Sequence, residues 1–309
     1  MSGRDHSLPG GFSQGIRLPL LALVGGALAV AFAPIFPKMA MTVSDTGPIA
    51  TAFWRLALAF PVLLVAWLIL RGRTSRPTPS KPMPLFWLFL PGIIFGFDLV
   101  TWHLSFPLTT AANATLLANL EVVLVGIVGW LVLKENLQWP FALGGVLALG
   151  GVALLMWSGP PATEGRSPLM GDLLALLTAV WYASYLLSVK RIRRQWNAMT
   201  VILISTGMSA IVLFISTIVG GESFIPNEPQ AWIYLILLAI IPHCLGQGLI
   251  IYALASLPAS LAAVTLLLQP VGAAIWGWLL LDEALNQFQI LASVIVLIGI
   301  GLARLGSGD

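Results

Sequence analysis

The heptapeptide GWLVLKE at residues 129–135 returns as GWLLLDE at residues 277–283. The two copies share five of their seven letters, and Glu283 follows Glu135 by 148 positions in a chain of 309 residues. Each copy ends a long apolar run, and a short proline hairpin precedes each run, SFPLT at 105–109 and SLPAS at 256–260. The sequence therefore predicts an internal duplication into two halves of similar fold.

The composition identifies the solvent around these runs. The chain is 58% hydrophobic and only 9% charged, with a mean hydropathy of +0.95, whereas a soluble domain carries about 25% charged residues. Apolar runs of about 18 or more residues can cross a bilayer core, and helices satisfy their own backbone hydrogen bonds in lipid. The short alternating segments of a transmembrane barrel are not visible. We therefore expect an all-α integral membrane protein.

Ten runs are long enough to span a bilayer. They lie at residues 18–37, 48–70, 84–104, 108–133, 139–157, 168–189, 199–220, 230–254, 259–281 and 286–304. The prediction is a cytoplasmic segment (1–17), a five-helix repeat (18–157), an outer linker (158–167), a second five-helix repeat (168–304) and a cytoplasmic tail (305–309). An alternative is that the first run is a signal peptide, because Ala27-Leu28-Ala29 resembles a cleavage site. Its removal would leave four spans against five.

Basic residues predict the orientation of these spans. With a cytoplasmic N-terminus, Lys38 and Arg166 fall outside and Arg55 lies in the membrane. The positions that fall inside are Arg4, Arg17, Arg71, Arg73, Arg76, Lys81, Lys134, Lys190, Arg191, Arg193, Arg194 and Arg304. This distribution follows the positive-inside rule. It predicts a multi-pass protein of a bacterial-type inner membrane with both termini in the cytoplasm.

An odd number of spans per half inverts the second half. GWLVLKE then ends a helix at the cytoplasmic face, and GWLLLDE ends its counterpart at the outer face. Lys134 inside and Asp282 outside fit these two places. The fold class predicted is therefore ten transmembrane helices arranged as two inverted five-helix repeats, an architecture of many secondary transporters. Chance similarity between two Leu-rich helices is the alternative.

The two halves also carry a recognisable set of residues. These are Lys38, Pro48, Phe53-Trp54-Arg55, Leu120-Glu121-Val122 and Lys134-Glu135 in the first half, and Leu268-Gln269-Pro270 and Asp282-Glu283 in the second. With them, residues 18–304 resemble the EamA family of the drug/metabolite transporter superfamily. The first span lacks the Trp-Gly that is frequent in that family, and Val122 stands where Pro is common. The resemblance implies transport of amino acids or related metabolites, usually outward.

Two ionisable residues lie deep in the second and third spans. Arg55 is about seven residues from the outer end of its span, and Asp98 is about six from the outer end of its own. Because charges in a bilayer are costly, we expect the two to pair. The pair is either a structural clamp between adjacent helices or part of a gate or substrate site.

The middle of the duplicated span carries polar side chains in both halves. Glu121 corresponds to Gln269 at the same offset of 148 residues. Helical spacing places Asn113 on the face of Glu121 and Trp276 on the face of Gln269, and Pro270 frees a backbone carbonyl one turn earlier. We expect these groups to face a central cavity. The alternative is polar contact between helices, worth only about 0.6 kcal/mol per hydrogen bond.

Aromatic and imidazole side chains follow in the second half. Trp181, Tyr182 and Tyr185 form a stripe on the sixth span, where they either stack on a planar ligand or pack against other helices. His243 and Gln247 are one turn apart in the eighth span. His243 could bind a substrate carboxylate, pair with Glu121 or carry a proton, or it could be an ordinary packing residue.

These features predict a secondary transporter that works by alternating access, with a small-molecule substrate and the lipid bilayer as its partners. Pro107 and Pro258 are the expected hinges, and coupling to a proton or ion is possible. The resemblance to the EamA family implies an amino acid as the substrate, and we expect its side chain to be aromatic or apolar. We expect no nucleic-acid partner, and no GxxxxGK[ST] motif for ATP is present. An intramembrane enzyme is disfavoured, because three His and the single Cys244 offer no catalytic cluster, metal site or cofactor site. A channel is disfavoured by the sparse polar residues.

Overall fold

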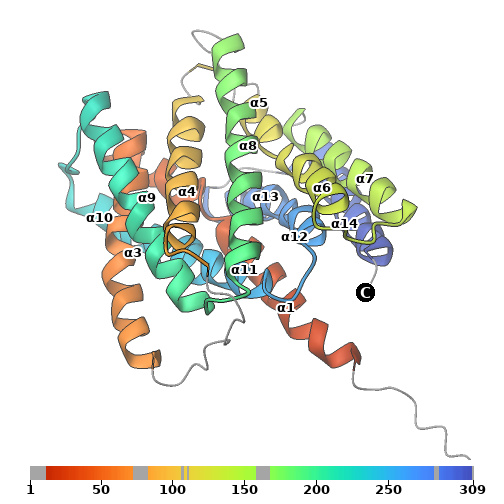
Figure 1. Cartoon of the computed structure of the whole chain (residues 1–309). Helices are drawn as coiled ribbons and strands as arrows, with labels where there is room; N and C mark the ends of the chain where they lie inside the picture. Colours follow the sequence, from red (N-terminus) through yellow and green to blue (C-terminus); the bar gives the residue numbers. More distant parts are fainter. Residues whose placement is uncertain are drawn as a thin grey trace, which may run out of the picture.

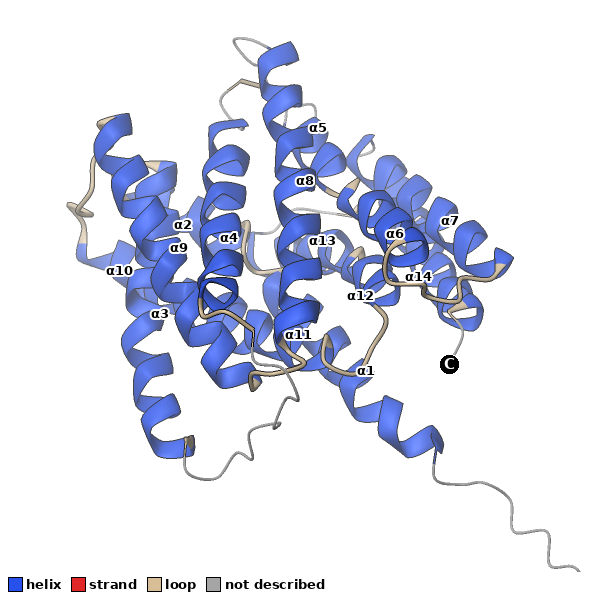
Figure 2. Cartoon of the chain, in the orientation of Figure 1, coloured by secondary structure: helices blue, strands red, loops and turns tan. Residues whose placement is uncertain are grey.

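The computed structural model describes residues 12–71, 83–105, 108–109, 111–157, 168–281 and 285–307. This part of the chain contains ten helical spans long and apolar enough to cross a membrane, and its only β-pairing is an isolated bridge between Leu137 and Ser307. The prediction of an all-α, multi-pass membrane fold is confirmed (Figures 1 and 2).

Counting only described residues in either half, the first half holds seven helices. They are α1 (Phe12–Val30), α2 (Ile35–Val43), α3 (Pro48–Leu70), α4 (Phe86–Ser105), α5 (Ala111–Ala118), α6 (Glu121–Leu131) and α7 (Trp139–Trp157). The second half holds seven α-helices and one π-helical segment. They are α8 (Pro168–Ile192), α9 (Ala198–Gly220), α10 (Pro229–Leu238), η1 (Ala239–Gln247), α11 (Gly248–Ala253), α12 (Ala259–Leu266), α13 (Leu268–Leu281) and α14 (Gln287–Gly306).

Several spans that we expected to be continuous are interrupted. The fourth span consists of α5 and α6, and the ninth consists of α12 and α13. The helices α5 and α12 start 148 residues apart, at Ala111 and Ala259, and each has eight residues. The interruption therefore occurs at the same place in both halves. A discontinuous helix in each repeat is typical of the substrate sites of transporters.

The two halves run in opposite directions at their shared centre. The backbone N–H of Ala50, at the start of α3, donates to the Glu222 carboxylate just after α9, at 2.8 Å. Near the other end of α3, the Trp67 indole donates to the hydroxyl of Thr200 at the start of α9, at 3.0 Å. The second spans of the two repeats, α3 and α9, are therefore antiparallel neighbours.

The fifth spans of the two repeats, α7 and α14, are also antiparallel. Gln138, before α7, donates its backbone N–H to the carbonyl of Gly306 at the end of α14, at 2.9 Å. Glycines let the two backbones approach closely: a Cβ atom on Gly144 would lie 2.3 Å from the backbone nitrogen of Ala303. Small residues at helix interfaces have this role in membranes, where lipid offers no hydrophobic drive for association.

Two further contacts between the halves correspond to each other: the third span of each half packs on the first span of the other half. Helix α4, the third span, packs on α8, which opens the second half; α1, which opens the first half, packs on η1 and α11 of the eighth span. This pattern is what an inverted repeat requires, and it surrounds the two interrupted spans with helices from both halves (Figure 1).

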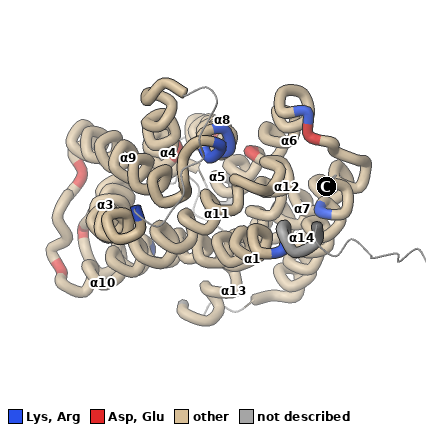
Figure 3. Tube along the Cα trace, turned by 60° about the horizontal axis from the view of Figure 1, so that its bottom comes forward, with Lys and Arg blue, Asp and Glu red and all other residues tan. Residues whose placement is uncertain are grey.

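One end of the molecule, here called the basic face, collects positive charge. The ends of α6 and α8 meet the start of α12 there through Glu135 and Lys190, and Gln195 after α8 bonds Met83 before α4. Helix ends at this face carry Arg71, Lys134, Lys190, Arg191, Arg193 and Arg194. Figure 3 views the molecule with this face forward. The end that holds Glu222 and Asp172, where Asp172 on α8 accepts a hydrogen bond from Thr109 after α4, is called the opposite face.

Candidate functional site

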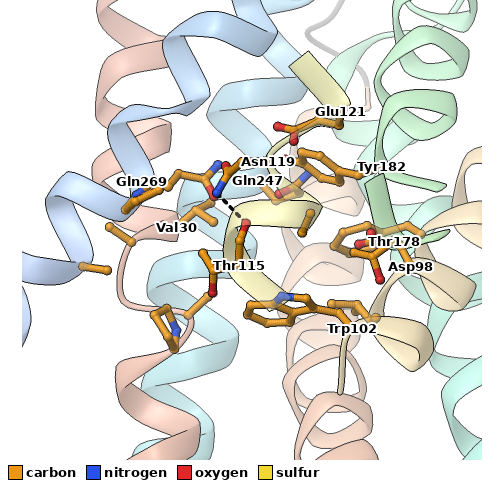
Figure 4. Close-up of a pocket in the computed structure, with 18 of the residues that line it drawn as sticks. Val30, Asp98, Trp102, Thr115, Asn119, Glu121, Thr178, Tyr182, Gln247 and Gln269 are labelled. Carbon is orange, nitrogen blue, oxygen red and sulfur yellow. Dashed lines mark hydrogen bonds between the residues drawn. The ribbon is translucent and has the colours of Figure 1, made fainter. Parts of the chain in front are cut away.

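A central cavity of about 850 Å³, open space at its mouth included, lies between the two halves. Its walls come from the α1–α2 turn, α3, α4, the α5–α6 interruption, α8, η1 and α13. The polar and aromatic residues that line it are Arg55, Phe95, Asp98, Trp102, Thr115, Asn119, Glu121, Thr178, Tyr182, Gln247 and Gln269 (Figure 4).

The cavity extends from the middle of the bundle toward the opposite face. Glu121 and Gln247 mark its deep end, whereas Trp102 lies three residues before the end of α4 and Thr115 is the fifth of the eight residues of α5. The end of α4 and the start of α5 are at the opposite face. Thr109, which lies between these two helices, donates a hydrogen bond to Asp172 near the start of α8.

The interrupted spans supply the deep wall. Glu121 is the first residue of α6, and Gln269 is the second residue of α13. The Asn119 side-chain amide donates to the carbonyl of Thr115 at 2.8 Å and so partners one of the carbonyls at the end of α5. The amino end of a helix carries a partial positive charge of about half an elementary charge, which favours anions. Two such ends from opposite halves therefore point polar groups into one cavity.

Three ionisable side chains lie on the cavity wall. Arg55 is 5%, Asp98 6% and Glu121 3% exposed. One atom of each is buried and lacks a hydrogen-bond partner: Nε of Arg55, Oδ1 of Asp98 and Oε2 of Glu121. Buried polar groups without a partner are costly. Their presence in a cavity is typical of a site completed by a ligand.

The predicted pairing of Arg55 with Asp98 is not a direct ion pair in this structure. Both line the cavity and attract each other through space. Among the residues described, however, no hydrogen bond or ion pair within 4.0 Å joins them. Each is therefore available to a group that enters between them.

Tyr182, Gln247 and Gln269 also line the cavity, as the sequence predicted. Tyr185 lies behind this wall: it is 1% exposed, its ring stacks on Phe95 with centroids 4.8 Å apart, and its hydroxyl accepts a hydrogen bond from Gln247 Nε2 at 2.9 Å. Tyr185 therefore holds Gln247 in place and does not itself reach the cavity.

Three other predicted residues pack outside the cavity. Trp181 stacks on Phe97 with centroids 5.5 Å apart. His243 is 1% exposed and lies 2.7 Å from the Thr206 hydroxyl. Trp276 stacks on a phenylalanine of the α1–α2 turn and donates to the carbonyl of Leu28 at 3.2 Å. In this conformation, therefore, Trp181, His243 and Trp276 pack against other side chains and do not line the cavity.

The remaining predicted positions lie at or beyond the edge of the described residues. The side chain of Asn113 and the whole of Pro107 lie outside them. Pro258 directly precedes α12 as its N-cap residue. Sequence reasoning missed Asn119, Thr115 and Trp102 as lining residues, although the polar pair Thr115 and Asn119 directly before Glu121 was a usable signal.

The basic face is closed below the cavity by the same glutamate that ends GWLVLKE. Glu135 accepts hydrogen bonds from the backbone N–H groups of Ala259, at 2.7 Å, and Ser260, at 3.2 Å, and from the Ser260 hydroxyl. It thus caps α12, a helix of the other half that is buried along its whole length. Lys190 donates to the carbonyl of Leu257 beside it. In the part of the chain that the structure describes, no cluster of three metal-ligating side chains is found.

Comparisons with known proteins agree with this architecture. The model of the EamA-like transporter family matches residues 17–157 and again residues 169–305. An uncharacterized transporter of Archaeoglobus fulgidus is 27% identical over 87% of this chain and 91% of its own length. The uncharacterized transporter YyaM of Bacillus subtilis is 23% identical over 84% of this chain and 85% of its own. A solved crystal structure with 18% identity has a similar fold, with a TM-score of 0.78 over 94% of this chain and 99% of that one.

Proposed function

The chain belongs to the EamA-like transporter family, and on this premise we propose that it exports small zwitterionic metabolites, aromatic or apolar amino acids foremost. The observation that carries the proposal is the cavity in which Arg55, Asp98 and Glu121 meet the interrupted helices. A protein of ten spans that holds three buried charges around an open space is suited to a charged solute.

The groups on the wall match the two ends of an amino acid. The Arg55 guanidinium suits a carboxylate, because charge-assisted hydrogen bonds from Arg are strong and directional. Asp98 and Glu121 suit an ammonium group. Trp102 and Tyr182 offer ring surfaces to the side chain of the substrate. Export of aromatic amino acids, as in YddG-type members of the family, fits this set of groups.

Transport would proceed by alternating access between the two inverted halves. In the conformation described, the cavity extends toward the opposite face, while Glu135 and the buried α12 close the basic face. By the positive-inside rule the basic face is cytoplasmic, in an inner membrane, with both termini in the cytoplasm. Rocking of the halves, with Pro107 and Pro258 as hinges, would close the outer side and release the Glu135 cap.

Counterflow into proteoliposomes tests the proposal. Vesicles loaded with an unlabelled amino acid should take up labelled L-tryptophan and L-phenylalanine, with saturation. Arg55→Gln and Asp98→Asn should each reduce the rate about tenfold or more, since a hydrogen bond to a charged group is worth about 1.5–3 kcal/mol. Glu228→Gln, at an exposed carboxylate before α10, should have no effect.

The same assay tests two side chains that the sequence predicted as substrate-binding residues. Trp181→Ala and His243→Ala should alter the rate only through packing, because neither side chain lines the cavity. Uptake that fails to saturate, or uptake that Arg55→Gln and Asp98→Asn leave unchanged, contradicts a carrier that binds its substrate at this site.

A further inference from the structure

The cavity contains one more acid than base. Among the described residues that line it, Asp98 and Glu121 are acidic and Arg55 is basic. Arg55 attracts Asp98, and Asp98 repels Glu121. Asp98 thus lies near both Arg55 and Glu121, and among the described residues no ion pair joins Glu121 to a cation. A carboxylate that is 3% exposed and lacks a countercharge is neutralised by a cation or by a proton.

Among the described residues, no other titratable group near Glu121 supplies that charge. Tyr182 and Tyr185 on α8 are neutral donors, and Gln269 on α13 is an amide. The imidazole of His243 on η1 has no hydrogen-bond partner at Nδ1, which disfavours an imidazolium with two N–H groups to satisfy. His103 on α4 and Cys244 on η1 do not line the cavity.

The amino end of α6 makes the Glu121 site reversible. Glu121 is the first residue of α6, and the positive end of the helix favours the ionised form of its carboxyl group. A helix end supplies only about half a charge, which does not balance a full carboxylate that Asp98 also repels. The corresponding residue of the other half, Gln269, carries no charge, so a single exchangeable site results.

From this arrangement we propose that Glu121 binds either a proton or the ammonium group of the substrate, so that transport is an exchange of one for the other. This inference rests on the proposed function and names its coupling ion. An entering ammonium group displaces the proton from Oε2 to the adjoining solution, while Arg55 receives the carboxylate. The returning carrier takes up a proton at the other face. One proton thus moves inward for each zwitterion exported, with net movement of one positive charge.

The proton can be detected without any substrate. Infrared spectra of the purified protein at pH 7 should contain the carbonyl band of a protonated carboxyl group. The band should be absent from Glu121→Gln, present in Glu121→Asp and present in the surface control Glu228→Gln. Size-exclusion profiles check that each variant is folded. A wild-type spectrum without the band overturns the proton site. A band that folded Glu121→Gln leaves unchanged and Asp98→Asn removes also overturns it, because the proton would then be on Asp98.

The exchange is tested in sodium-free proteoliposomes with the membrane potential clamped by potassium and valinomycin. An imposed difference of one pH unit should accumulate L-tryptophan about tenfold on the acidic side, since one unit is a tenfold proton ratio. Glu121→Gln should not accumulate tryptophan above its equilibrium level, whatever rate of exchange remains, because the amide cannot hold the exchanged proton. 3-Indolepropionate, which lacks the ammonium group, should not be accumulated by the exchange.

The outcomes separate the two proposals. Wild-type protein that equilibrates tryptophan without accumulating it overturns the exchange and leaves the proposed function standing. Accumulation that survives in Glu121→Gln also overturns it. If the wild type moves neither L-tryptophan nor L-phenylalanine in counterflow, the proposed function and the exchange both fail. The infrared band alone then decides whether Glu121 holds a proton.

Discussion

Tyr182 and Tyr185 lie one turn apart on α8 with ring centroids 5.8 Å apart, yet they have different surroundings. Tyr182 lines the cavity, whereas Tyr185 is buried and bonded to Gln247. Tyr182→Ala should therefore raise the apparent KM for tryptophan severalfold, because an aromatic contact is worth about 0.5–1.5 kcal/mol, and should affect alanine less. Counterflow at a series of substrate concentrations measures this.

Tyr185→Phe is the matched change. It should leave the KM for tryptophan within about twofold and lower the free energy of unfolding by about 1 kcal/mol, through the lost hydrogen bond to Gln247. Thermal unfolding followed by size-exclusion chromatography reports the second effect. A larger KM effect from Tyr185→Phe than from Tyr182→Ala would contradict the assignment of these two side chains.

At this scale the sequence predicted the charged residues better than the aromatic ones. Arg55, Asp98 and Glu121 were identifiable because ionisable groups are rare at bilayer depth. The residues against which Trp276 and His243 pack could not be identified from the sequence. Trp276 bonds to Leu28, which is 248 residues away. His243 lies in a π-helical segment, where the 3.6-residue spacing used to assign faces no longer holds.

Among the elements, the α7–α14 contact offers a matched pair of glycines. A Cβ atom on Gly144 would lie 2.3 Å from backbone of α14, whereas one on neighbouring Gly145 would have nothing within 4 Å. Gly144→Ala should destabilise the protein by about 1–3 kcal/mol through overpacking. Gly145→Ala should be neutral or slightly stabilising, because Ala is the better helix former.

Thermal unfolding of the two variants in the same detergent is the measurement. Equal midpoints for Gly144→Ala and Gly145→Ala would show that the two helices do not pack through this glycine, and would remove one of the two antiparallel contacts on which the inverted arrangement rests.

The cap formed by Glu135 links the two halves at the basic face. Glu135→Ala removes the acceptor for the N–H groups of Ala259 and Ser260, and a lost helix cap costs about 0.5–2 kcal/mol. We expect this face to open more often. In a Cys244→Ser background, a reporter cysteine at Leu257, which is 1% exposed, should react several times faster with a maleimide.

The control for this experiment is the neighbouring Asn136→Ala, which removes an exposed side chain. It should leave the reactivity of Leu257→Cys unchanged. A reporter that reacts at the same rate with and without Glu135 would mean that the cap does not hold the basic face closed.

Sequence reasoning identified every span but only part of the helix interruptions. In the ninth span, Pro270 predicted a freed carbonyl at Leu266, and α12 ends at that residue. The fourth span has Val122 in place of the proline, so no residue in this stretch of sequence predicted that α5 ends at Ala118. Packing of α5 and α6 against α8 from the other half maintains that interruption, and such contacts between distant segments cannot be read from one window of sequence.

For the whole molecule, the duplicated heptapeptide has a structural explanation in the first copy. Glu135 ends GWLVLKE and caps a helix of the opposite half, so the acidic end of the motif joins the repeats. The antiparallel contacts of α3 with α9 and of α7 with α14 agree with the inversion predicted from an odd number of spans. With ten spans in two such sets, the deep end of the cavity lies near the middle of the bundle, where residues of both halves meet.

The inversion itself is tested most directly by which side of the membrane reaches each copy of the motif. In a Cys244→Ser background, single cysteines at Asn136 and Gln287, both exposed beyond the two copies, are treated with a membrane-impermeant maleimide on intact cells. The account predicts labelling of Gln287→Cys from outside and of Asn136→Cys only after permeabilisation. Labelling of both cysteines from the same side would contradict it.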